Sequence, residues 1–434
     1  MESQSTLPNY ADVTIRFLYS DERPFQTFET RMPLVIEAKQ QVSVAFLKDF
    51  LRSHSSELLQ HVAEYGAVLL RGFELKQDRD CEELVLSIKN MRPMDGYFLS
   101  ELGRDRIPNT RYMFYTNTFY KTGGSFLMGK FHSENYYSID VPSFICFFCI
   151  KNSWFGGETG LIDTTRIYHS LDEQLKQVLA DTLCCPMALP LSYIQQFYEL
   201  PDGVVEKFFR SSGLKIDEHN GEKIFFLCKP NIYKHPDGYG DALQVSLGIE
   251  LPKLNHSLFE HIKHFYKGYK WSLHKLTWRY NSIAHCLAIP SFIVILGKLL
   301  FNPSLRKRVK LERKFFKEYY QTNNEPNIIR LKNMIDNKKI KPIAKKMAEH
   351  LSVFSWRKGD FLIIDNRKII HGGLPGMGPR TIHAILCNPL DLTHADNGVI
   401  QLDKLNPSNR SVFEKLQEFS ESRSSLRTNT SITD

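Results

Sequence analysis

The sequence predicts an α+β protein, in which one β-rich domain is interrupted by a long helical insertion. Short apolar and aromatic runs, punctuated by Gly and Pro as strands are, fill residues 112–165 and return after residue 350. Between them, residues 253–350 are rich in Lys, Phe and Tyr and have a mostly helical period. A chain of 434 residues, 42% apolar and 24% charged, is long enough for one large domain or two ordinary ones.

The first part of the chain alternates between helical and strand patterns. Residues 43–60 repeat apolar side chains near one helical face, and residues 81–90 also look helical. Between them, the short apolar run GAVLLRGF at 66–73 has Gly near both ends, which is typical of a buried strand. We therefore expect a helix, a buried strand and a second helix before the strand-rich segment.

Helices and strands also alternate beyond the strand-rich segment. Residues 164–182 start with a Thr-Thr pair and predict an amphipathic helix, whereas residues 186–250 predict short strands and turns. Strands resume after the insertion in FSWRKGDFLIIDNRKIIHGG and PRTIHAIL. Residues 416–434 are polar and rich in Ser and Thr, so we expect a disordered tail.

The insertion is the strongly basic part of the chain. Residues 1–252 and 351–415 are expected to form one domain, and residues 253–350 join it just before its last strands. The window 251–350 holds 21 Lys or Arg and six Asp or Glu, a charge of +15, although the whole chain carries +8. We keep three interpretations: a solvated helical face, a docking surface for an acidic partner such as a carrier protein, or contact with nucleic acid or an anionic membrane. Among these partners, no nucleic acid is expected. Because the insertion joins the domain just before its last strands, it can also lie over the active-site mouth as a lid.

Cysteine usage and the start of the chain predict a cytoplasmic location. The first residues lack a basic region followed by an apolar stretch, so no secretory signal is predicted. The eight cysteines are scattered without a disulfide-framework spacing, which favours reduced thiols. Cys146 and Cys149 form a C-x-x-C inside the apolar run SFICFFCIK. That run predicts a buried strand rather than a redox or zinc site.

A second apolar run raises the question of membrane contact. Residues 280–297 carry no formal charge over 18 positions, which is near the lower limit for a membrane span. The run also contains an Asn, two Ser, a His and a Pro. A buried helical hairpin, peripheral contact with a membrane or acyl chain, and a true span all stay open, and the polar residues favour the first.

Two stretches far apart in the sequence carry candidate metal ligands. In GKFHSENYYS, His132 and Glu134 are two residues apart, so on a strand their side chains would share one face. The stretch GDFLIIDNRKIIHGG predicts a turn, a buried strand, a second turn and a strand that ends at His371. Two neutral imidazoles and one carboxylate suit non-haem Fe(II) with open coordination positions. Arg380, after a Gly- and Pro-rich loop, can hold the far carboxylate of an organic co-substrate.

Four motifs together resemble the TauD/TfdA superfamily of Fe(II)- and 2-oxoglutarate-dependent oxygenases. They are GAVLLRGF, FHSENYY, FGGETGLID and GDFLIIDNRKIIHGGLPGMGPR, and the resemblance covers about residues 30–250 and 351–390. Within the superfamily, the chain is most similar to the branch that resembles the syringomycin-pathway aspartyl hydroxylase. The resemblance implies a double-stranded β-helix, or jelly roll, flanked by helices.

The same resemblance implies roles for five residues. His132, Glu134 and His371 would bind iron, while Thr159 and Arg380 would bind the distal carboxylate of 2-oxoglutarate. With O2 as the oxidant, the expected activity is hydroxylation of an aliphatic C–H bond of an amino acid or amino-acid-like metabolite, free or tethered to a carrier. Two alternatives are the same chemistry on a lipid-like or acyl-amine substrate, and a non-catalytic binding protein that uses the basic insertion.

Three departures from the superfamily pattern bear on this expectation. Many relatives have an Arg two residues after the second histidine, where this chain has Gly373. The insertion is much longer than the usual connector. Glu134 replaces the commoner Asp, as in members that hydroxylate amino-acid carbons, and it is not the Ala or Gly that leaves a halide site in halogenases.

Five further polar residues lie near these motifs. Asn117 is placed to line the substrate pocket and offer its amide. Asp360 and Asp365 are expected to form turns rather than to bind metal. His383 is interpreted as a core histidine, and His235 in KHPDGYG as a turn residue.

Overall fold

The fold is described from a computed structural model of the chain. The described residues are 7, 10–25, 29–94, 106–116, 126, 128–135, 139–180, 183–219, 221–244, 251–280, 293, 296, 297, 300, 301, 303, 306, 310, 337–390, 395, 396, 399, 400 and 410–430.

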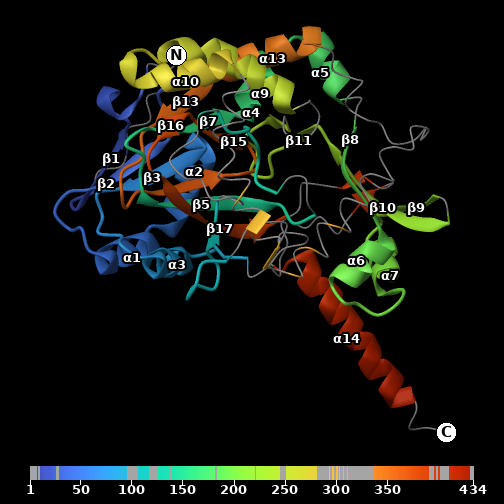
Figure 1. Ribbon diagram of the computed structural model, residues 1–434. Helices are drawn as coiled ribbons and strands as arrows, with labels where there is room; N and C mark the ends of the chain where they lie inside the picture. Colours follow the sequence, from blue (N-terminus) through green and yellow to red (C-terminus); the bar gives the residue numbers. More distant parts are fainter. Residues whose placement is uncertain are drawn as a thin grey trace.

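A seven-stranded sheet forms the centre of the molecule (Figure 1). Its neighbouring strands are antiparallel except for β2 and β3, which are parallel. In spatial order the strands are β1 (Val13–Phe17), β2 (Leu34–Ala38), β3 (Ala67–Arg71), β14 (Phe361–Asp365), β5 (Pro142–Lys151), β17 (Thr381–Pro389) and β4 (Phe114–Tyr115).

A smaller sheet packs against one face of the large one. It consists of β13 (Leu351–Phe354), β7 (Thr159–Asp163) and β15 (Ile369–Gly373), and the short strands β6 (Phe155–Gly156) and β16 (Gly376–Met377) pair beside it. Buried side chains of both sheets, among them Phe147, Leu161 and Phe354, form one shared core. Two facing sheets with helices outside them confirm the α+β jelly-roll prediction.

Three helices cover the outer face of the large sheet: α1 (Val44–Ser53), α2 (Ser55–Tyr65) and α3 (Asp78–Ser87). Ser43 starts α1, because its side chain accepts a hydrogen bond from the Phe46 amide. The helix predicted at 43–60 is therefore confirmed as two helices that meet at His54. The second ends at Gly66, whose φ of +79° suits glycine and where a Cβ would lie 2.5 Å from Ile369.

Helices also cover the outer face of the small sheet. We call α9 (Leu251–Ile262), the short 3-10 helices η2 (Lys263–Phe265) and η3 (Tyr269–Trp271), α10 (Ser272–Arg279) and α13 (Asn337–Glu349) the helical layer; α4 (Thr164–Ser170) and α5 (Glu173–Ala180) lie beside it. Its apolar faces share a core with strands β7, β13 and β15. In Figure 1 this layer forms the upper edge of the molecule.

The helical layer contains the described ends of the predicted insertion. Helical structure is found there as expected, and its buried faces pack onto the small sheet. Residues 281–292 and 311–336 lie outside the described residues, so the boundaries 253–350 and the lid role stay predictions. Most of the apolar run 280–297 also lies outside. Among the described residues, no helix combines the length and the apolar character needed to cross a membrane.

A second lobe lies at the right of Figure 1, with its own core. It combines a five-stranded sheet with three helices and lies beside the hairpin of β11 (Ile232–Lys234) and β12 (Asp241–Leu243). Its elements are β8 (Leu183–Pro190), β9 (Lys215–His219), β10 (Glu222–Pro230), β18 (Ala395–Asp396), β19 (Val399–Ile400), α6 (Leu191–Phe197), α7 (Val204–Ser211) and α14 (Val412–Thr430).

This lobe differs from the sequence expectation in two ways. Helices α6 and α7 lie in a segment predicted to hold strands and turns. Helix α14 runs from Val412 to Thr430, where a disordered tail was expected from residue 416. The start of this helix is held in place because Val412 and Leu416 are buried in the core of the lobe.

The four cysteines whose side chains are described are all free and buried, namely Cys81, Cys146, Cys149 and Cys387. Cys146 packs in the core beneath the helices, whereas Cys149 packs in the core between the sheets. The two residues of the C-x-x-C therefore face opposite sides of β5, as the strand interpretation predicted.

Candidate metal centre

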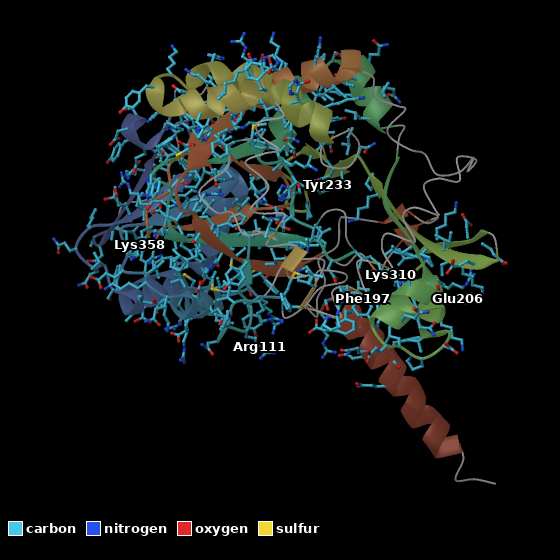
Figure 2. The ribbon with its side chains drawn as sticks, in the orientation of Figure 1. Arg111, Phe197, Glu206, Tyr233, Lys310 and Lys358 are labelled. Carbon is cyan, nitrogen blue, oxygen red and sulfur yellow. The ribbon has the colours of Figure 1, made fainter. Side chains whose placement is uncertain are left out.

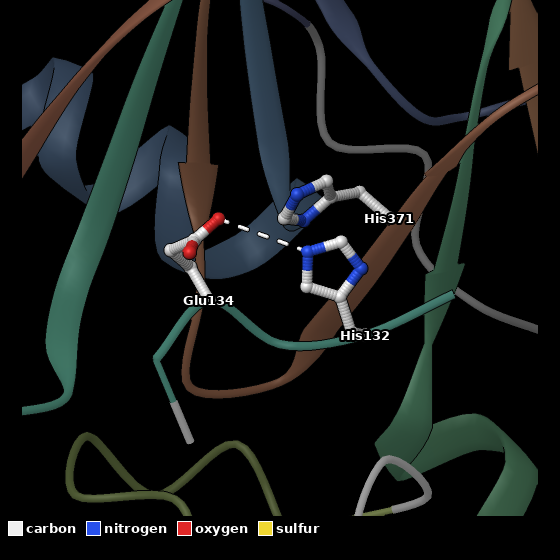
Figure 3. Close-up of side chains that lie close together, drawn as sticks. All are labelled: His132, Glu134 and His371. Carbon is white, nitrogen blue, oxygen red and sulfur yellow. Dashed lines mark ion pairs between the residues drawn. The ribbon is translucent and has the colours of Figure 1, made fainter. Parts of the chain in front are cut away.

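Three residues singled out in the sequence meet at one point (Figure 3). His132, Glu134 and His371 each offer a ligand atom, and these atoms all lie within 4.8 Å of one another. The Nε2 of His132 is 3.8 Å from the Oε2 of Glu134, and the two imidazole ring centres are 4.7 Å apart.

Backbone pairing joins the two distant segments. His371 lies on β15, and its amide and carbonyl exchange hydrogen bonds of 3.0 and 3.1 Å with the carbonyl and amide of His132. This is an isolated bridge, not a strand. Beyond it the chain turns at Glu134 and Asn135, and Asn135 has a φ of +54°. The predicted strand geometry for His132 and Glu134 is therefore wrong, although the two side chains still converge.

Small residues beside the ligands make room for one aromatic ring. Phe131 packs between Gly160 on β7 and Gly372 on β15. A Cβ at Gly160 would lie 2.6 Å from the Phe131 ring, and one at Gly372 would lie 2.8 Å from it. Any side chain at either glycine would push Phe131 away and shift the neighbouring His132.

Asn366 fixes the backbone of Glu134. Its side-chain oxygen accepts a 2.6 Å hydrogen bond from the Glu134 amide, and its side-chain nitrogen donates to the Glu134 carbonyl over 3.0 Å. The same nitrogen donates to the carbonyl of Pro142 over 2.9 Å. The sequence analysis missed this role, although Asn366 lies inside the motif that ends at His371.

A buried polar network extends this support. Ser133, between the two ligands, donates to Gln244, whose amide donates to Tyr233. The Tyr233 hydroxyl donates to the Arg367 carbonyl. Arg367 in turn binds both oxygens of Asp365, the residue before Asn366, over 2.8 and 2.9 Å. Burial alone would raise the pKa of Asp365, but Arg367 and His235 hold it well below its usual value.

The donor set fits Fe(II). The Nδ1 of His132 lies 2.7 Å from the carbonyl oxygen of Lys130, so the ring donates there and leaves its Nε2 lone pair toward Glu134 and His371. Two imidazoles and a carboxylate on one side of a site are the ligands of mononuclear non-haem iron. The Glu134 side chain is 1% exposed and that of His132 is 33% exposed. The ligands are thus held from the protein interior, and the centre is open on the side of His132.

The two residues predicted to bind 2-oxoglutarate, Arg380 and Thr159, also lie close together. The Nη2 of Arg380 donates to Thr159 Oγ1 over 3.0 Å, and the Trp356 indole donates to the same oxygen over 2.8 Å. The Thr159 oxygen thus already accepts two hydrogen bonds. A further partner can only accept a hydrogen bond from the hydroxyl. Thr159 also pairs with Gly373 on β15, two residues after His371.

The charge on Arg380 is not balanced by an ion pair among the described residues. Its Nε is buried there without a hydrogen-bond partner, and burial lowers the pKa of its guanidinium. Glu158, the preceding neighbour of Thr159, is also buried, and burial raises the pKa of its carboxyl group to about 7. A guanidinium, a donating hydroxyl and a carboxyl group whose ionisation is opposed by burial together favour an anionic ligand.

The remaining predicted residues have other positions. Asp360 forms a buried ion pair with Arg71, at 2.6 Å. Asp365 accepts from the Arg367 amide in a turn, as predicted, and also binds buried His235 over 2.9 Å. His383 is a core histidine, as interpreted, and its Nδ1 lies close to Asp78 of α3. Asn117 lies outside the described residues.

Comparison with known proteins identifies the family. Residues 28–246, half of the chain, match the sequence model described as taurine catabolism dioxygenase TauD, TfdA family. The chain belongs to this family. The matched range includes His132, Glu134 and Thr159 and ends before His371 and Arg380.

Individual relatives are distant. The dapdiamide synthesis protein DdaC of Enterobacter agglomerans is 28% identical over 133 residues, which cover 31% of this chain and 37% of that protein. Among solved structures, PvcB of Pseudomonas aeruginosa has a TM-score of 0.46 and 12% identity, covering 93% of this chain and 98% of PvcB. A taurine dioxygenase of Burkholderia xenovorans has a TM-score of 0.43 and 11% identity, covering 88% and 91% of the two chains.

Proposed function

We propose that this protein is an Fe(II)- and 2-oxoglutarate-dependent oxygenase that hydroxylates an aliphatic C–H bond of an amino acid or amino-acid-like metabolite. The observation that carries the proposal is the convergence of His132, Glu134 and His371 from segments far apart in the sequence. Family membership supports it, because the family is one of dioxygenases.

His132, Glu134 and His371 would hold the iron, and the iron would supply the redox chemistry with dioxygen and the 2-oxo acid. The protein's own part is to bind and to orient. Arg380 would form a charge-assisted pair with the distal carboxylate of 2-oxoglutarate, and the Thr159 hydroxyl would donate to it. The indole of Trp356 keeps that hydroxyl turned so that it can only donate. Asn366 and the network behind it would keep Glu134 in place when the metal dissociates.

The amino-acid class of substrate is supported by two features of the sequence. Glu134 is found where members that act on amino-acid carbons have it, and the four motifs are most similar to an aspartyl-hydroxylase-like branch. The substrate would be free or held by an acidic carrier protein that docks on the basic insertion.

A lipid-like or acyl-amine substrate is the second candidate. It is favoured by one specific observation: α10 exposes Leu273 and Leu276 while its opposite face lies against the Gly156 and Gly376 loops beside Arg380. The chemistry would be the same, and the substrate would arrive from an apolar phase. A non-catalytic binding protein would keep the basic surface and fail the metal test below.

Anaerobic titration with Fe(II) and 2-oxoglutarate tests the proposal directly. Wild-type protein is expected to develop the visible charge-transfer absorption of an iron-bound 2-oxo acid, and to release succinate when oxygen is admitted. His132→Ala should lose both signals. His169→Ala is the matched control, because His169 is an exposed histidine on α4 outside the site.

Two outcomes would contradict the assignment. If wild-type protein gives no absorption band, the binding-protein hypothesis replaces the enzyme. If His132→Ala keeps metal-dependent succinate release, the ligand set is wrong. For wild-type enzyme, succinate release with amino acids, carrier-loaded aminoacyl groups and acyl amines then separates the substrate classes.

A further inference from the structure

The outer side of the helical layer carries an apolar stripe. Four residues are spaced by four, three and four positions from η3 to the end of α10 and are between 39% and 93% exposed: Tyr269, Leu273, Leu276 and Tyr280. Leu273 and Leu276 share one face of α10. Large exposed apolar side chains scattered singly need no explanation, but a contiguous row of them marks a contact surface.

The opposite face of the same segment is locked into the protein. Trp271, His274 and Thr277 are buried, and the Nε2 of His274 lies 3.1 Å from the Gly376 carbonyl oxygen. The neighbouring Trp278 donates its indole N–H to the Phe126 carbonyl. Because the inner face is fixed by these contacts, the outer residues cannot be buried by rotating the helix.

Positive charge surrounds the stripe. Residues 261–280, which carry the stripe, contain five Lys or Arg and no Asp or Glu. In the described parts of the layer the acidic residues are Glu260 and Glu349, and each already forms an ion pair, with Lys263 and Lys346. Figure 2 shows nitrogen-tipped side chains projecting outward along this edge of the molecule. The exposed cations near the stripe are Lys263, Lys267, Lys270, Lys275 and Arg279.

A second exposed apolar group follows in the sequence with the same character. Ile293, Leu296, Leu300 and Phe301 are helical in conformation, repeat at three, seven and eight positions, and are 56% to 89% exposed. Two cations, Arg306 and Lys310, are exposed shortly after them. Figure 2 labels Lys310 well below the helical layer, so this second group is separate from the stripe.

We propose that the outer surface of the helical layer docks on an anionic membrane surface, with Tyr269, Leu273 and Leu276 entering the headgroup region. Helices that lie in the plane of a membrane have this composition, with Leu and aromatic residues on one face and Lys and Arg at its borders. Long basic side chains can reach lipid phosphates while their stems cover apolar surface. This inference goes beyond the proposed enzymatic function and does not depend on it.

Charge decides between a membrane and a second copy of the chain. In a two-fold symmetric dimer the same patch meets itself, so the cations around the stripe would face each other. Like charges across an interface oppose association, whereas an anionic bilayer attracts them and takes up the apolar residues.

Docking in this orientation would place lipid close to the candidate metal centre. The buried side of α10 reaches the Gly376 carbonyl, and the Cη2 atom of Trp271 lies 2.6 Å from where a Cβ would stand on Gly156. Next to it, the corresponding position on Gly157 is 3.4 Å from the Arg380 side chain. One helix diameter, about 10 Å, therefore separates the proposed membrane face from the loops beside Arg380.

Vesicle co-sedimentation of the full-length protein, without metal, tests this proposal. Binding to phosphatidylcholine vesicles that contain roughly 30% phosphatidylserine should be at least about tenfold stronger than binding to phosphatidylcholine alone. Raising the salt from about 0.1 to 0.5 M should weaken it severalfold. Leu273→Asp/Leu276→Asp and Lys275→Glu/Arg279→Glu should each reduce binding by about tenfold or more.

Matched controls are available on other faces of the molecule. Leu86→Asp changes an exposed leucine on α3, and Lys207→Glu an exposed lysine on α7, and both should bind vesicles as wild type does. Circular dichroism confirms that each variant is folded. Equal binding to neutral and anionic vesicles, or full binding by both double variants, would overturn the proposal. Self-association of the wild type that Leu273→Asp/Leu276→Asp abolishes, without vesicle binding, would assign the surface to a second copy instead.

Discussion

Two arginines of this protein, the buried Arg71 and the partly buried Arg380, have opposite surroundings. Arg71 donates to both oxygens of Asp360 over 3.0 and 2.6 Å and to Glu22 over 2.7 Å. Arg380 donates to the hydroxyl of Thr159, and the described residues offer it no ion pair. One guanidinium is thus fully matched by carboxylates inside the protein, and the other is left with its charge unbalanced.

The pKa values of the two groups express this difference. Burial alone would lower the pKa of Arg71, but Asp360 and Glu22 raise it above its ordinary value. At Arg380 burial prevails and the pKa is lowered. Burial opposes the charged form of both arginines, but only Arg71 has carboxylate partners in the fold that offset this cost. A partly buried charge without an ion-pair partner among the described residues favours an external anion. The comparison therefore separates an arginine that stabilises the fold from one that we propose binds a ligand.

Removal of the two guanidinium groups should give the largest difference in the free energy of unfolding between matched variants. Arg71→Met leaves Asp360 as a buried carboxylate without its cation, whereas Glu22 keeps its ion pair with Arg16. We expect a loss of about 3–5 kcal/mol in the free energy of unfolding. Arg380→Met strands no carboxylate and should cost less than about 1 kcal/mol. Urea unfolding of both variants checks this. Equal losses would show that Arg380 has a structural role as well.

The ligand side of the comparison is tested by affinity. Arg380→Ala should raise the concentration of 2-oxoglutarate needed for half-saturation on the order of ten- to a thousandfold, because a buried charge-assisted pair is lost. Titration followed by succinate release measures it. Arg71→Lys, which keeps a charge among the carboxylates, should leave this concentration within a few fold of wild type. An unchanged requirement in Arg380→Ala would move the anchor elsewhere.

The acid beside Arg380 should make stability depend on pH. Burial raises the pKa of Glu158 from 4.5 to about 7, so the folded state holds a proton that the unfolded state has released. Its contribution is fully present below pH 4.5 and is lost as the pH rises through about 7, in total about 3 kcal/mol. Glu158→Gln removes this dependence, so the variant should gain stability relative to wild type between pH 4.5 and 8. The free energy of unfolding of both proteins is measured at several pH values. A difference between wild type and Glu158→Gln that stays constant with pH would refute the prediction.

The smallest expected effect concerns a positioning residue. Asn366→Ala removes three hydrogen bonds to the backbone around Glu134 without touching a ligand atom. We expect the affinity for iron to fall by about ten- to a hundredfold. The position of Arg380, the proposed anchor of 2-oxoglutarate, should be unchanged. Competition for Fe(II) with a chromophoric chelator measures the change. Asn388→Ala, near the end of β17, is the control, because it also removes side-chain hydrogen bonds to the backbone.

The sequence predicted several of the strands and the convergence of the candidate ligands. Apolar periodicity identified β3, β5 and β14, because fully buried strands leave continuous apolar runs. Motif resemblance brought His132 and His371 together, and the isolated bridge between them is the physical form of that prediction.

What the sequence could not predict depends on distant partners. Asn135 with a positive φ and the Asn366 clamp turn the chain at Glu134, and neither leaves a periodic signal. The ion cluster of Arg71 joins side chains that are 49 and 289 residues apart. Helix α14 is mostly polar, so its sequence gives no clear apolar periodicity. The fully buried Leu416 holds the helix against the rest of the protein.

The strand order of the large sheet interleaves the two ends of the chain. Strand β14, from beyond the helical layer, lies between β3 and β5, and β17 lies between β5 and β4. A protein cut once between α10 and α13 would therefore give two fragments, neither of which contains the complete large sheet or the complete sheet of β13, β7 and β15. Each would need the other as a template, so the nicked protein should stay together as a complementing pair. Co-expressed halves should reassemble and bring His132 and His371 together again.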